Sequence, residues 1–132
     1  MVADGLTLPD RRVDIRFEGD PGEVPAEVAT PLAVVLVELV QNAVEHAFGP
    51  GGGTVVARMS QETGFVRLLV EDDGEGLPEG FNLAESGLGL QIVRALVGSE
   101  LHGKLNISSG GGNGGSGGNA GVTAIVDIPL RI

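Results

Sequence analysis

The chain has 132 residues, of which 42% are hydrophobic and only 3% aromatic, so we expect one domain with a core of Val, Leu, Ile and Ala. Its formal net charge of −10 argues against a nucleic-acid partner and against binding to anionic membrane surfaces, because both require clustered Lys and Arg. The absence of cysteine excludes disulfides, thiolate metal sites and cysteine nucleophiles.

The first strand and the first helix are predicted in the first third of the chain. Residues Arg12–Glu18 alternate polar and apolar side chains, which indicates a half-buried strand. Val24–Ala29 suit a short helical turn, and a long helix is predicted to begin with Thr30 as its N-cap and Pro31 at its first helical position. The glycine-rich run from residue 49 to residue 53 ends this helix at about residue 47 or 48.

Four more strands and a second helix are predicted beyond this point. Residues Thr54–Ser60 and Phe65–Glu71 are typical of two strands joined by a short turn. Residues Asp72–Ser86 contain several Gly and Pro and are predicted to form a loop. From Gly87 to about Val97 the chain is apolar at helical spacing. The last two strands are predicted at Lys104–Ser108 and Val122–Ile128.

This order of elements predicts an α+β fold for the single domain 1–132. Strands paired through hairpins, with helices between them, favour a two-layer sandwich: a mixed, mostly antiparallel sheet with helices on one face. Between the last two strands, Gly110–Gly121 is low-complexity sequence and is predicted to be a flexible hairpin loop. Phosphate binding by these glycines is the less favoured alternative, because a binding site needs fixed backbone geometry.

Four polar residues share one face of the otherwise apolar first helix. Glu38, Asn42, Glu45 and His46 lie at positions i, i+4, i+7 and i+8. A solvated helix face is one interpretation, but the stripe contains no Lys or Arg and a helix this apolar is mostly buried. A cavity wall is the other interpretation, and carboxylate and amide oxygens there would suit a hard cation such as Mg²⁺.

Asp72, Gly74 and Gly76 follow the second strand of the hairpin. An ordinary turn accounts for this pattern, because Asp and Gly dominate turns. A carboxylate at a strand end, followed by glycines that let a ligand approach the backbone, would also recognise an exocyclic amine. The pattern alone leaves both interpretations open.

The run from Gly87 to Leu90 opens the second helix. Helix N-termini present free N–H groups, so phosphate binding is one interpretation and a glycine hinge is the other. The Walker A pattern is absent, and the Rossmann pattern fails because Ile92 stands where its third glycine belongs. His102, in a predicted turn after this helix, is interpreted as a surface residue.

Together and in this order, the motifs resemble the ATP-binding domain shared by bacterial sensor histidine kinases, DNA gyrase, Hsp90 and MutL. Glu38-x-x-x-Asn42-Ala is similar to the N box of that family, Asp72-x-Gly74-x-Gly76 to its G1 box, Gly87-Leu-Gly89-Leu90 to its G2 box, and Gly121-Val-Thr123 to a degenerate form of its closing Gly-Thr motif. The resemblance covers about residues 12 to 130. Residues around the boxes are similar to kinases of the second dimerisation-domain type, which include soluble actinobacterial sensors of the PdtaS kind.

The resemblance implies a Bergerat-type ATP-binding fold with a role for each box. Asn42 would hold the Mg²⁺ that bridges the phosphates, and Asp72 would accept the adenine amino group. Glu38 takes the position of the acidic general base or metal-orienting residue. The other implied ATP contacts are Gly74 and Gly76 at the base, Gly87, Leu88, Gly89 and Leu90 at the phosphates, Thr123 near the adenine, and His46 in place of the Lys that many kinases carry where this chain has Glu45.

The implied activity is that of the catalytic domain of a protein histidine kinase. Such a domain binds Mg²⁺-ATP and donates the γ-phosphate to a histidine on a separate phosphoacceptor helical domain of the same kinase, with a response regulator downstream. Nothing before Arg12 forms such a helical hairpin, so we expect a catalytic fragment of a longer kinase that does not autophosphorylate alone.

Two alternatives stay open. A stand-alone anti-sigma-factor serine kinase has the same fold at this length, although the run Gly87–Val93 is more similar to a sensor kinase. A degenerate module that no longer takes ATP is the other alternative, and the intact Asn42 and Asp72 argue against it.

The sequence also predicts no contact of this domain with a membrane. Its longest apolar run, Pro31–Val37, is too short to span a bilayer, and the first residues lack the basic start and apolar stretch of a signal peptide. A soluble, cytoplasmic domain is therefore the default expectation.

Overall fold

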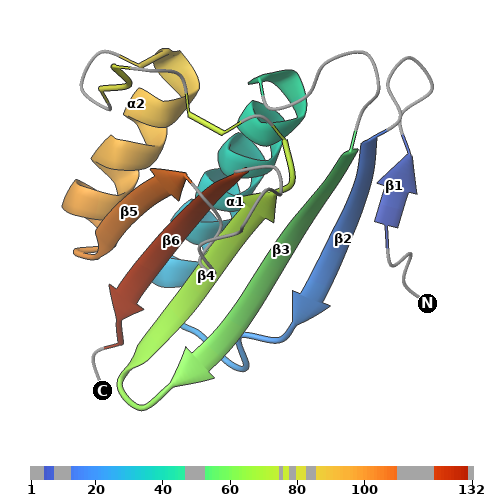
Figure 1. Ribbon diagram of the computed structural model, residues 1–132. Helices are drawn as coiled ribbons and strands as arrows, with labels where there is room; N and C mark the ends of the chain where they lie inside the picture. Colours follow the sequence, from blue (N-terminus) through green and yellow to red (C-terminus); the bar gives the residue numbers. More distant parts are fainter. Residues whose placement is uncertain are drawn as a thin grey trace.

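The computed structural model describes residues 5–7, 13–46, 53–74, 76–77, 80–82, 86–109 and 121–130. These residues form one six-stranded sheet, in the order β1-β2-β3-β4-β6-β5, with the helices on one face (Figure 1). The elements are β1 (Gly5–Thr7), β2 (Val13–Gly19), α1 (Ala26–His46), β3 (Gly53–Glu62), β4 (Phe65–Asp72), α2 (Leu88–Ala95), the π-helix η2 (Leu96–Glu100), β5 (Lys104–Ser109) and β6 (Val122–Pro129).

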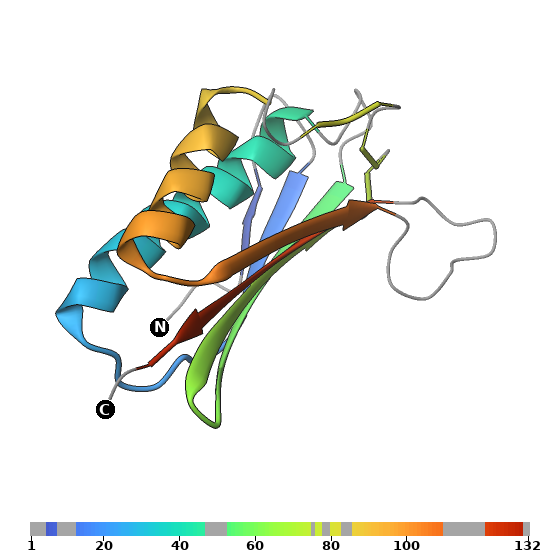
Figure 2. The same ribbon diagram turned by 90° about the vertical axis from the view of Figure 1, so that its left-hand side faces the viewer.

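The two-layer α+β prediction is confirmed. Among the strands that the structure describes, only β2 and β3 run parallel, and the other four strand pairs are antiparallel. Seen from the side, α1 and α2 lie next to each other on one face of a twisted sheet, and none of the helices in the described ranges lies on the other face (Figure 2). A parallel pair needs a crossover connection, and α1 supplies it between β2 and β3.

The core lies between the helices and the sheet because the inward residues of every central strand are aliphatic. In β4, Val66, Leu68 and Val70 are buried at alternate positions, as the two-residue period of a strand requires. Their buried neighbours across the sheet are Val55 and Ala57 of β3 and Ala124, Val126 and Ile128 of β6. The helices close this core with Leu32, Val35, Leu39 and Ala43 of α1, Leu90 and Val93 of α2, and Val97 of η2.

The predicted start of the first helix is wrong. The helix begins at Ala26 and continues through Pro31, which lies inside it. The Pro25 carbonyl accepts the N–H groups of Val28 at 2.9 Å and Ala29 at 2.8 Å, which closes the first turn. Val28 also packs against the core, so tertiary packing of the added turns outweighs the unfavourable proline.

Two further elements differ from the sequence prediction. Strand β1 was not predicted, because three residues are too few to show an alternating pattern, and its partner β2 provides the hydrogen bonds. The second helix was predicted to end near Val97, but the chain continues as a π-helix to Glu100. The predicted end of the first helix and residues 110–120 of the glycine-rich loop lie outside the described residues.

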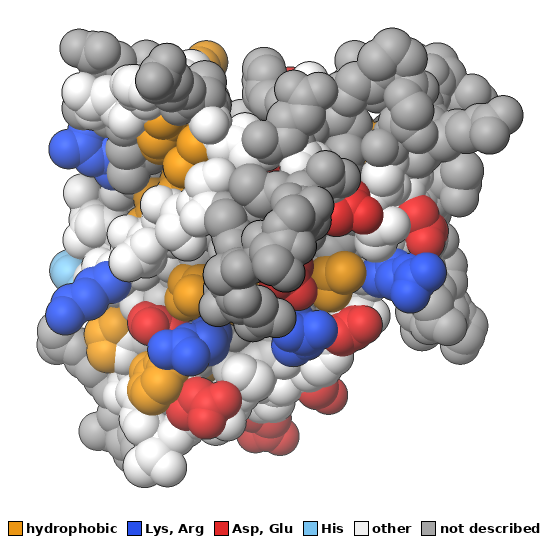
Figure 3. Space-filling view, viewed as in Figure 1, with side chains coloured by type: hydrophobic (Ala, Val, Ile, Leu, Met, Phe, Trp, Pro, Cys, Tyr) orange, Lys and Arg blue, Asp and Glu red, His pale blue; other side chains and the backbone are white. Residues whose placement is uncertain are grey.

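The face of the sheet without helices carries acidic and basic side chains side by side (Figure 3). Arg58 of β3 binds Glu18 of β2 at 2.7 Å, and Arg67 of β4 binds Asp127 of β6 at 2.7 Å. Both pairs are exposed, so they contribute little to stability. The second also crosses the β4–β6 pairing that positions the site described below.

By length and composition alone, α1 would qualify as a membrane span over Ala26–Glu45, a longer window than the apolar run considered in the sequence. In this fold the helix covers the sheet with one face, as core helices of soluble domains also do. The described residues contain no other helix of this kind.

Candidate functional site

A cavity of about 500 Å³ lies between α1, α2 and the ends of the central strands. It is lined by Leu39, Asn42 and Ala43 of α1, Val70 and Asp72 of β4, Gly76, Leu77, Phe81, Ser86 and Gly87 of the following loop, Leu90 of α2, Ile107 of β5, and Val122 and Ala124 of β6. The N box, the G1 box and the G2 box therefore each supply residues to one pocket.

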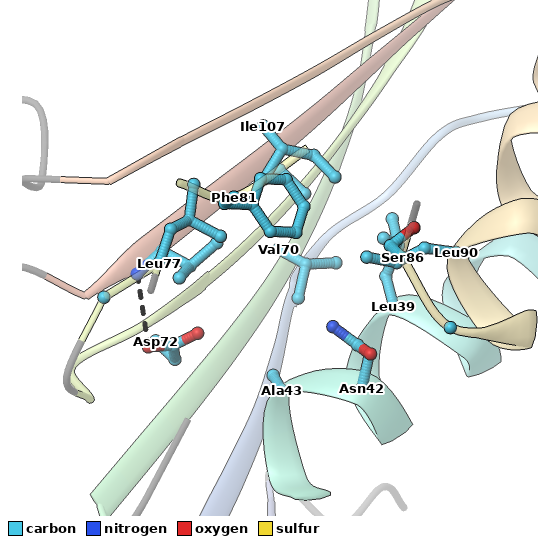
Figure 4. A pocket seen from close by; sticks show the side chains of 14 residues that line it. Leu39, Asn42, Ala43, Val70, Asp72, Leu77, Phe81, Ser86, Leu90 and Ile107 are labelled. Atoms are coloured by element: carbon cyan, nitrogen blue, oxygen red, sulfur yellow. Dashed lines mark hydrogen bonds between the residues drawn. The ribbon is translucent and has the colours of Figure 1, made fainter. Parts of the chain in front are cut away.

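Asp72 ends β4 and is held by backbone groups of two separate segments. Its Oδ1 accepts the N–H of Gly74 at 2.9 Å and the N–H of Val122 at 3.2 Å, the second drawn as a dashed line in Figure 4. Among the described residues no hydrogen bond reaches its Oδ2. The carboxylate is thus fixed in orientation and has one oxygen left to accept a hydrogen bond from a ligand.

Partial burial raises the pKa of Asp72 above its ordinary value. The two backbone N–H groups act in the opposite direction, and the nearby charges of Asp73 and Glu71 raise the pKa further. The carboxyl group therefore lies in a less polar setting than a surface aspartate, where a hydrogen bond to a ligand is strengthened.

Gly121 brings the start of β6 against the end of β4. Its N–H donates to the Gly74 carbonyl at 3.1 Å, and its φ of +53° is one that side chains rarely adopt. A Cβ at this position would collide with the carbonyl oxygen of Asp72. The glycine of the closing motif, Gly121, thus lets the Val122 N–H reach the Asp72 carboxylate.

Asn42 faces Asp72 from the helical side of the cavity (Figure 4). It is half-buried on α1, one turn beyond Glu38. Glu38 is half-buried too, but it does not line the cavity and lies against Gly89 of α2. The prediction that the polar face of this helix forms a cavity wall is therefore confirmed for Asn42. Glu38 is directed toward the neighbouring helix α2 instead.

The remainder of the wall is apolar. Val70, Leu77, Phe81 and Ile107 gather on the sheet side of the cavity (Figure 4). Sequence reasoning did not single these residues out as lining a site, because they come from different strands and from the loop. A flat apolar ring inserted between this wall and α1 would meet Asp72 at its edge.

The G2 run divides between cavity and surface. Gly87 and Leu90 line the cavity, whereas Leu88 is 76% exposed and does not. Gly87 is the N-cap of α2 but offers no side-chain cap, and the first turn of α2 contains no acidic residue. The N–H groups of that turn are therefore suited to an anionic group.

Ser86, at the junction of the loop with α2, is held by Gln91. The Gln91 side-chain amide donates to the Ser86 hydroxyl at 3.1 Å, and the Gln91 backbone N–H donates to the Gly87 carbonyl at 3.2 Å. These contacts place the end of the loop at the rim of the cavity.

Among the described residues, four of the predicted contacts do not line the cavity: Gly74, Leu88, Gly89 and Thr123. Thr123 lies between Val122 and Ala124, which both line it, so strand alternation directs the Thr123 side chain to the opposite face of the sheet. The part of the closing motif at the pocket is therefore Val122, through its N–H, and not Thr123. His46 is the last residue of α1, and its side chain lies outside the described residues.

The fold and this pocket define a nucleotide-binding ATPase domain. The chain belongs to the family described as histidine kinase-, DNA gyrase B- and HSP90-like ATPases, whose model matches residues 27–132. Its resemblance to sensor histidine kinases is likewise confirmed by individual relatives.

Among those relatives is the sensor histidine kinase PdtaS of Mycobacterium tuberculosis, 45% identical over 109 residues, which are 80% of this chain and 22% of PdtaS. The histidine kinase domain of a blue-light-activated kinase from Erythrobacter litoralis superimposes with a TM-score of 0.74 at 35% identity, covering 89% of this chain and 55% of that one. Histidine kinase ThkA, solved in complex with response regulator protein TrrA, matches with a TM-score of 0.64 at 28% identity, covering 90% of this chain and 34% of that one. The chain thus spans about a fifth of the length of PdtaS and is a histidine kinase ATPase domain.

Proposed function

We propose that the cavity binds ATP with its adenine ring against the apolar wall and its amino group at Asp72. The main support for this proposal is that the backbone N–H groups of Gly74 and Val122 fix the orientation of the Asp72 carboxylate. Gly76 leaves room for the base, and the phosphates would extend past Gly87 toward the first turn of α2. Leu90 also lines the cavity, whereas Leu88 is 76% exposed and does not, so Leu88 would contact the phosphates through its backbone N–H.

This arrangement suits an Mg²⁺ ion that binds together with the ATP phosphates. None of the described residues that line the cavity is Lys or Arg, so backbone N–H groups and a metal would have to neutralise the phosphates. The described residues contain no group of three His, Asp or Glu side chains that would hold a metal by themselves. Mg²⁺ commonly binds through one or two protein ligands together with substrate phosphates, and the Asn42 amide oxygen supplies one such ligand.

The reaction we propose is transfer of the ATP γ-phosphate to a histidine on a separate phosphoacceptor helical domain of the same kinase. Phosphoryl transfer needs positioning and charge stabilisation more than covalent chemistry, which this chain would provide through Asn42, the α2 N–H groups and Glu38 as the acidic catalytic group. Bound Mg²⁺ would neutralise charge that develops on the phosphates. Residues 1–132 would act as the catalytic unit of a longer cytoplasmic two-component sensor kinase.

A response regulator is the proposed downstream partner. The support is the likeness to ThkA, which was solved together with the response regulator TrrA. None of the relatives compared above is named as an anti-sigma-factor kinase, so the sensor kinase is the better supported of the two kinases of this fold.

Calorimetry with Mg²⁺-ATP tests the binding proposal. The chain should release heat with one site, and Asp72→Asn should weaken binding about tenfold or more, because the amide presents a donor where the amino group needs an acceptor. Asp127→Asn makes the same chemical change on the opposite face of the sheet and should bind as the unsubstituted chain does. If the unsubstituted chain releases no heat, the degenerate module is the correct interpretation.

Radioactive ATP tests the transfer proposal. Label should pass to the phosphoacceptor helical domain of the kinase when that domain is added in trans, and chain 1–132 alone should stay unlabelled. If the chain labels itself on a histidine, the separate acceptor is wrong.

A further inference from the structure

The second glycine of the G2 run does not face the cavity. Gly87 and Leu90 line the cavity, but Gly89 between them does not. The space that a side chain at Gly89 would occupy is filled from α1: a Cβ there would lie 2.9 Å from Glu38 Oε1. The missing side chain therefore accommodates a carboxylate of the protein.

Backbone conformation does not explain this glycine. Gly89 is the second residue of α2, and its φ does not lie in the left-handed region that favours glycine. Glycine stabilises a helix less than alanine does, so a glycine at position 89 lowers the stability of α2. The close approach of Glu38 is the feature of the structure that accounts for its presence.

The approach of Glu38 to Gly89 brings an acidic group to the first turn of α2. The first turn of α2 contains no acidic residue, and its N-cap Gly87 has no capping side chain. A carboxylate from a neighbouring helix is stabilised at such a helix start by the unpaired N–H groups and the helix dipole. The same turn is where the proposed function puts the ATP phosphates, so Glu38 is kept beside them.

We propose that Gly89 is a positioning residue that acts through Glu38: by lacking a side chain, it lets the Glu38 carboxylate lie against the first turn of α2, next to the transferred phosphate. This inference rests on the proposed function. It assigns the absence of a Gly89 side chain to the transfer step, while the backbone N–H of Gly89, in the first turn of α2, stays available to the phosphates.

The decisive variant is Gly89→Ala. The atom that its methyl group would meet is the far end of a flexible side chain, so Glu38 swings away and the fold is retained. Gly98→Ala is the matched control, because Gly98 lies in the helical segment that follows α2 and a Cβ there meets nothing within 4 Å. Thermal unfolding should show both variants folded.

The measurement is the rate of phosphotransfer to the phosphoacceptor domain in trans, as a function of ATP concentration. We expect Gly89→Ala to lower kcat about tenfold or more with KM changed less than about threefold, and Gly98→Ala to change neither. Glu38→Ala should lower kcat by roughly a hundredfold, and the double variant should be no slower than Glu38→Ala within about twofold, because the second change then has nothing left to displace.

Three results would overturn the inference: equal behaviour of Gly89→Ala and Gly98→Ala, a rise in KM without loss of kcat, or multiplied losses in the double variant. The last two would show that Gly89 acts independently of Glu38. A failure of the proposed function is distinguishable, because the unsubstituted chain would then neither bind Mg²⁺-ATP nor transfer label.

Discussion

The Asp72 carboxylate accepts the backbone N–H of Val122 at 3.2 Å, although the two residues are fifty positions apart in the chain. The contact exists because β4 and β6 pair antiparallel and Gly121 lets the start of β6 approach the end of β4. The orientation of the proposed adenine acceptor is therefore a property of the sheet.

Gly121→Ala should disrupt the junction. The substitution combines an unfavourable positive φ with a collision against the Asp72 carbonyl, and we expect a loss of about 2–3 kcal/mol of unfolding free energy together with weaker Mg²⁺-ATP binding. Urea unfolding and calorimetry measure the two effects. Gly64→Ala is the control, because Gly64 has a φ of +87° with nothing within 4 Å and should cost only about 1 kcal/mol. Equal losses at the two sites would show that the close approach is unimportant.

Asp72→Asn should stabilise the empty protein near neutral pH. Burial raises the folded-state pKa of Asp72, so its charged form is disfavoured by folding. Below the ordinary pKa of Asp, which applies to the unfolded chain, the protonated carboxyl contributes fully to the free energy of unfolding. This contribution is lost as the pH rises through the raised pKa of the folded state. Asn does not titrate, and its Oδ1 can still accept the two N–H groups.

Urea midpoints of the two proteins should therefore converge at acidic pH and separate in favour of Asp72→Asn as pH rises past that window. ATP affinity of the unsubstituted chain should fall over the same window on acidification, because the protonated carboxyl loses acceptor capacity. A stability difference that does not change with pH would contradict this explanation.

Pro31→Ala should stabilise the protein by about 1–3 kcal/mol. Pro31 lies inside α1, where it lacks an N–H and disfavours the helical conformation of the residue before it. Thermal unfolding provides the measurement. Pro25→Ala is the control, since Pro25 precedes the helix and contributes its carbonyl, which any residue supplies. No gain from Pro31→Ala would show that the proline costs the helix nothing here.

His102 and Gly103 should respond to substitution with opposite signs. His102 is exposed with a φ of +53°, so His102→Gly should relieve strain and stabilise the protein by about 1 kcal/mol. A Cβ at Gly103 would collide with the Asp127 carbonyl oxygen, so Gly103→Ala should lower the midpoint of urea unfolding. A destabilising His102→Gly would mean that the imidazole makes a contact that outweighs the backbone strain.

The identity of the elements could be predicted from local patterns. Alternation in Phe65–Glu71 and helical spacing after Gly87 describe β4 and α2, because burial on one face imposes these periods on any sequence. The start of α1 could not be predicted in this way, because Thr30 and Pro31 have the sequence pattern of a helix start although the helix begins earlier. Packing of Val28 against the core overrides that signal, and packing depends on residues far away in the chain.

The candidate site shows the same division. Asn42, Asp72 and Gly87 were found because their chemistry and spacing are visible in the chain, and the structure brings all three to one cavity. Phe81 and Ile107 look like any other apolar residues, and only the strand order β4-β6-β5 and the path of the loop bring them to that cavity.

The sequence by itself therefore determined the class of fold and the polar groups available to a nucleotide. The tertiary structure alone decided which of them share a pocket, that the Val122 N–H donates to Asp72, and that Glu38 lies against Gly89. The physical reason is that side-chain chemistry and periodicity are local properties, whereas strand register and helix packing are set by contacts between segments distant in the chain.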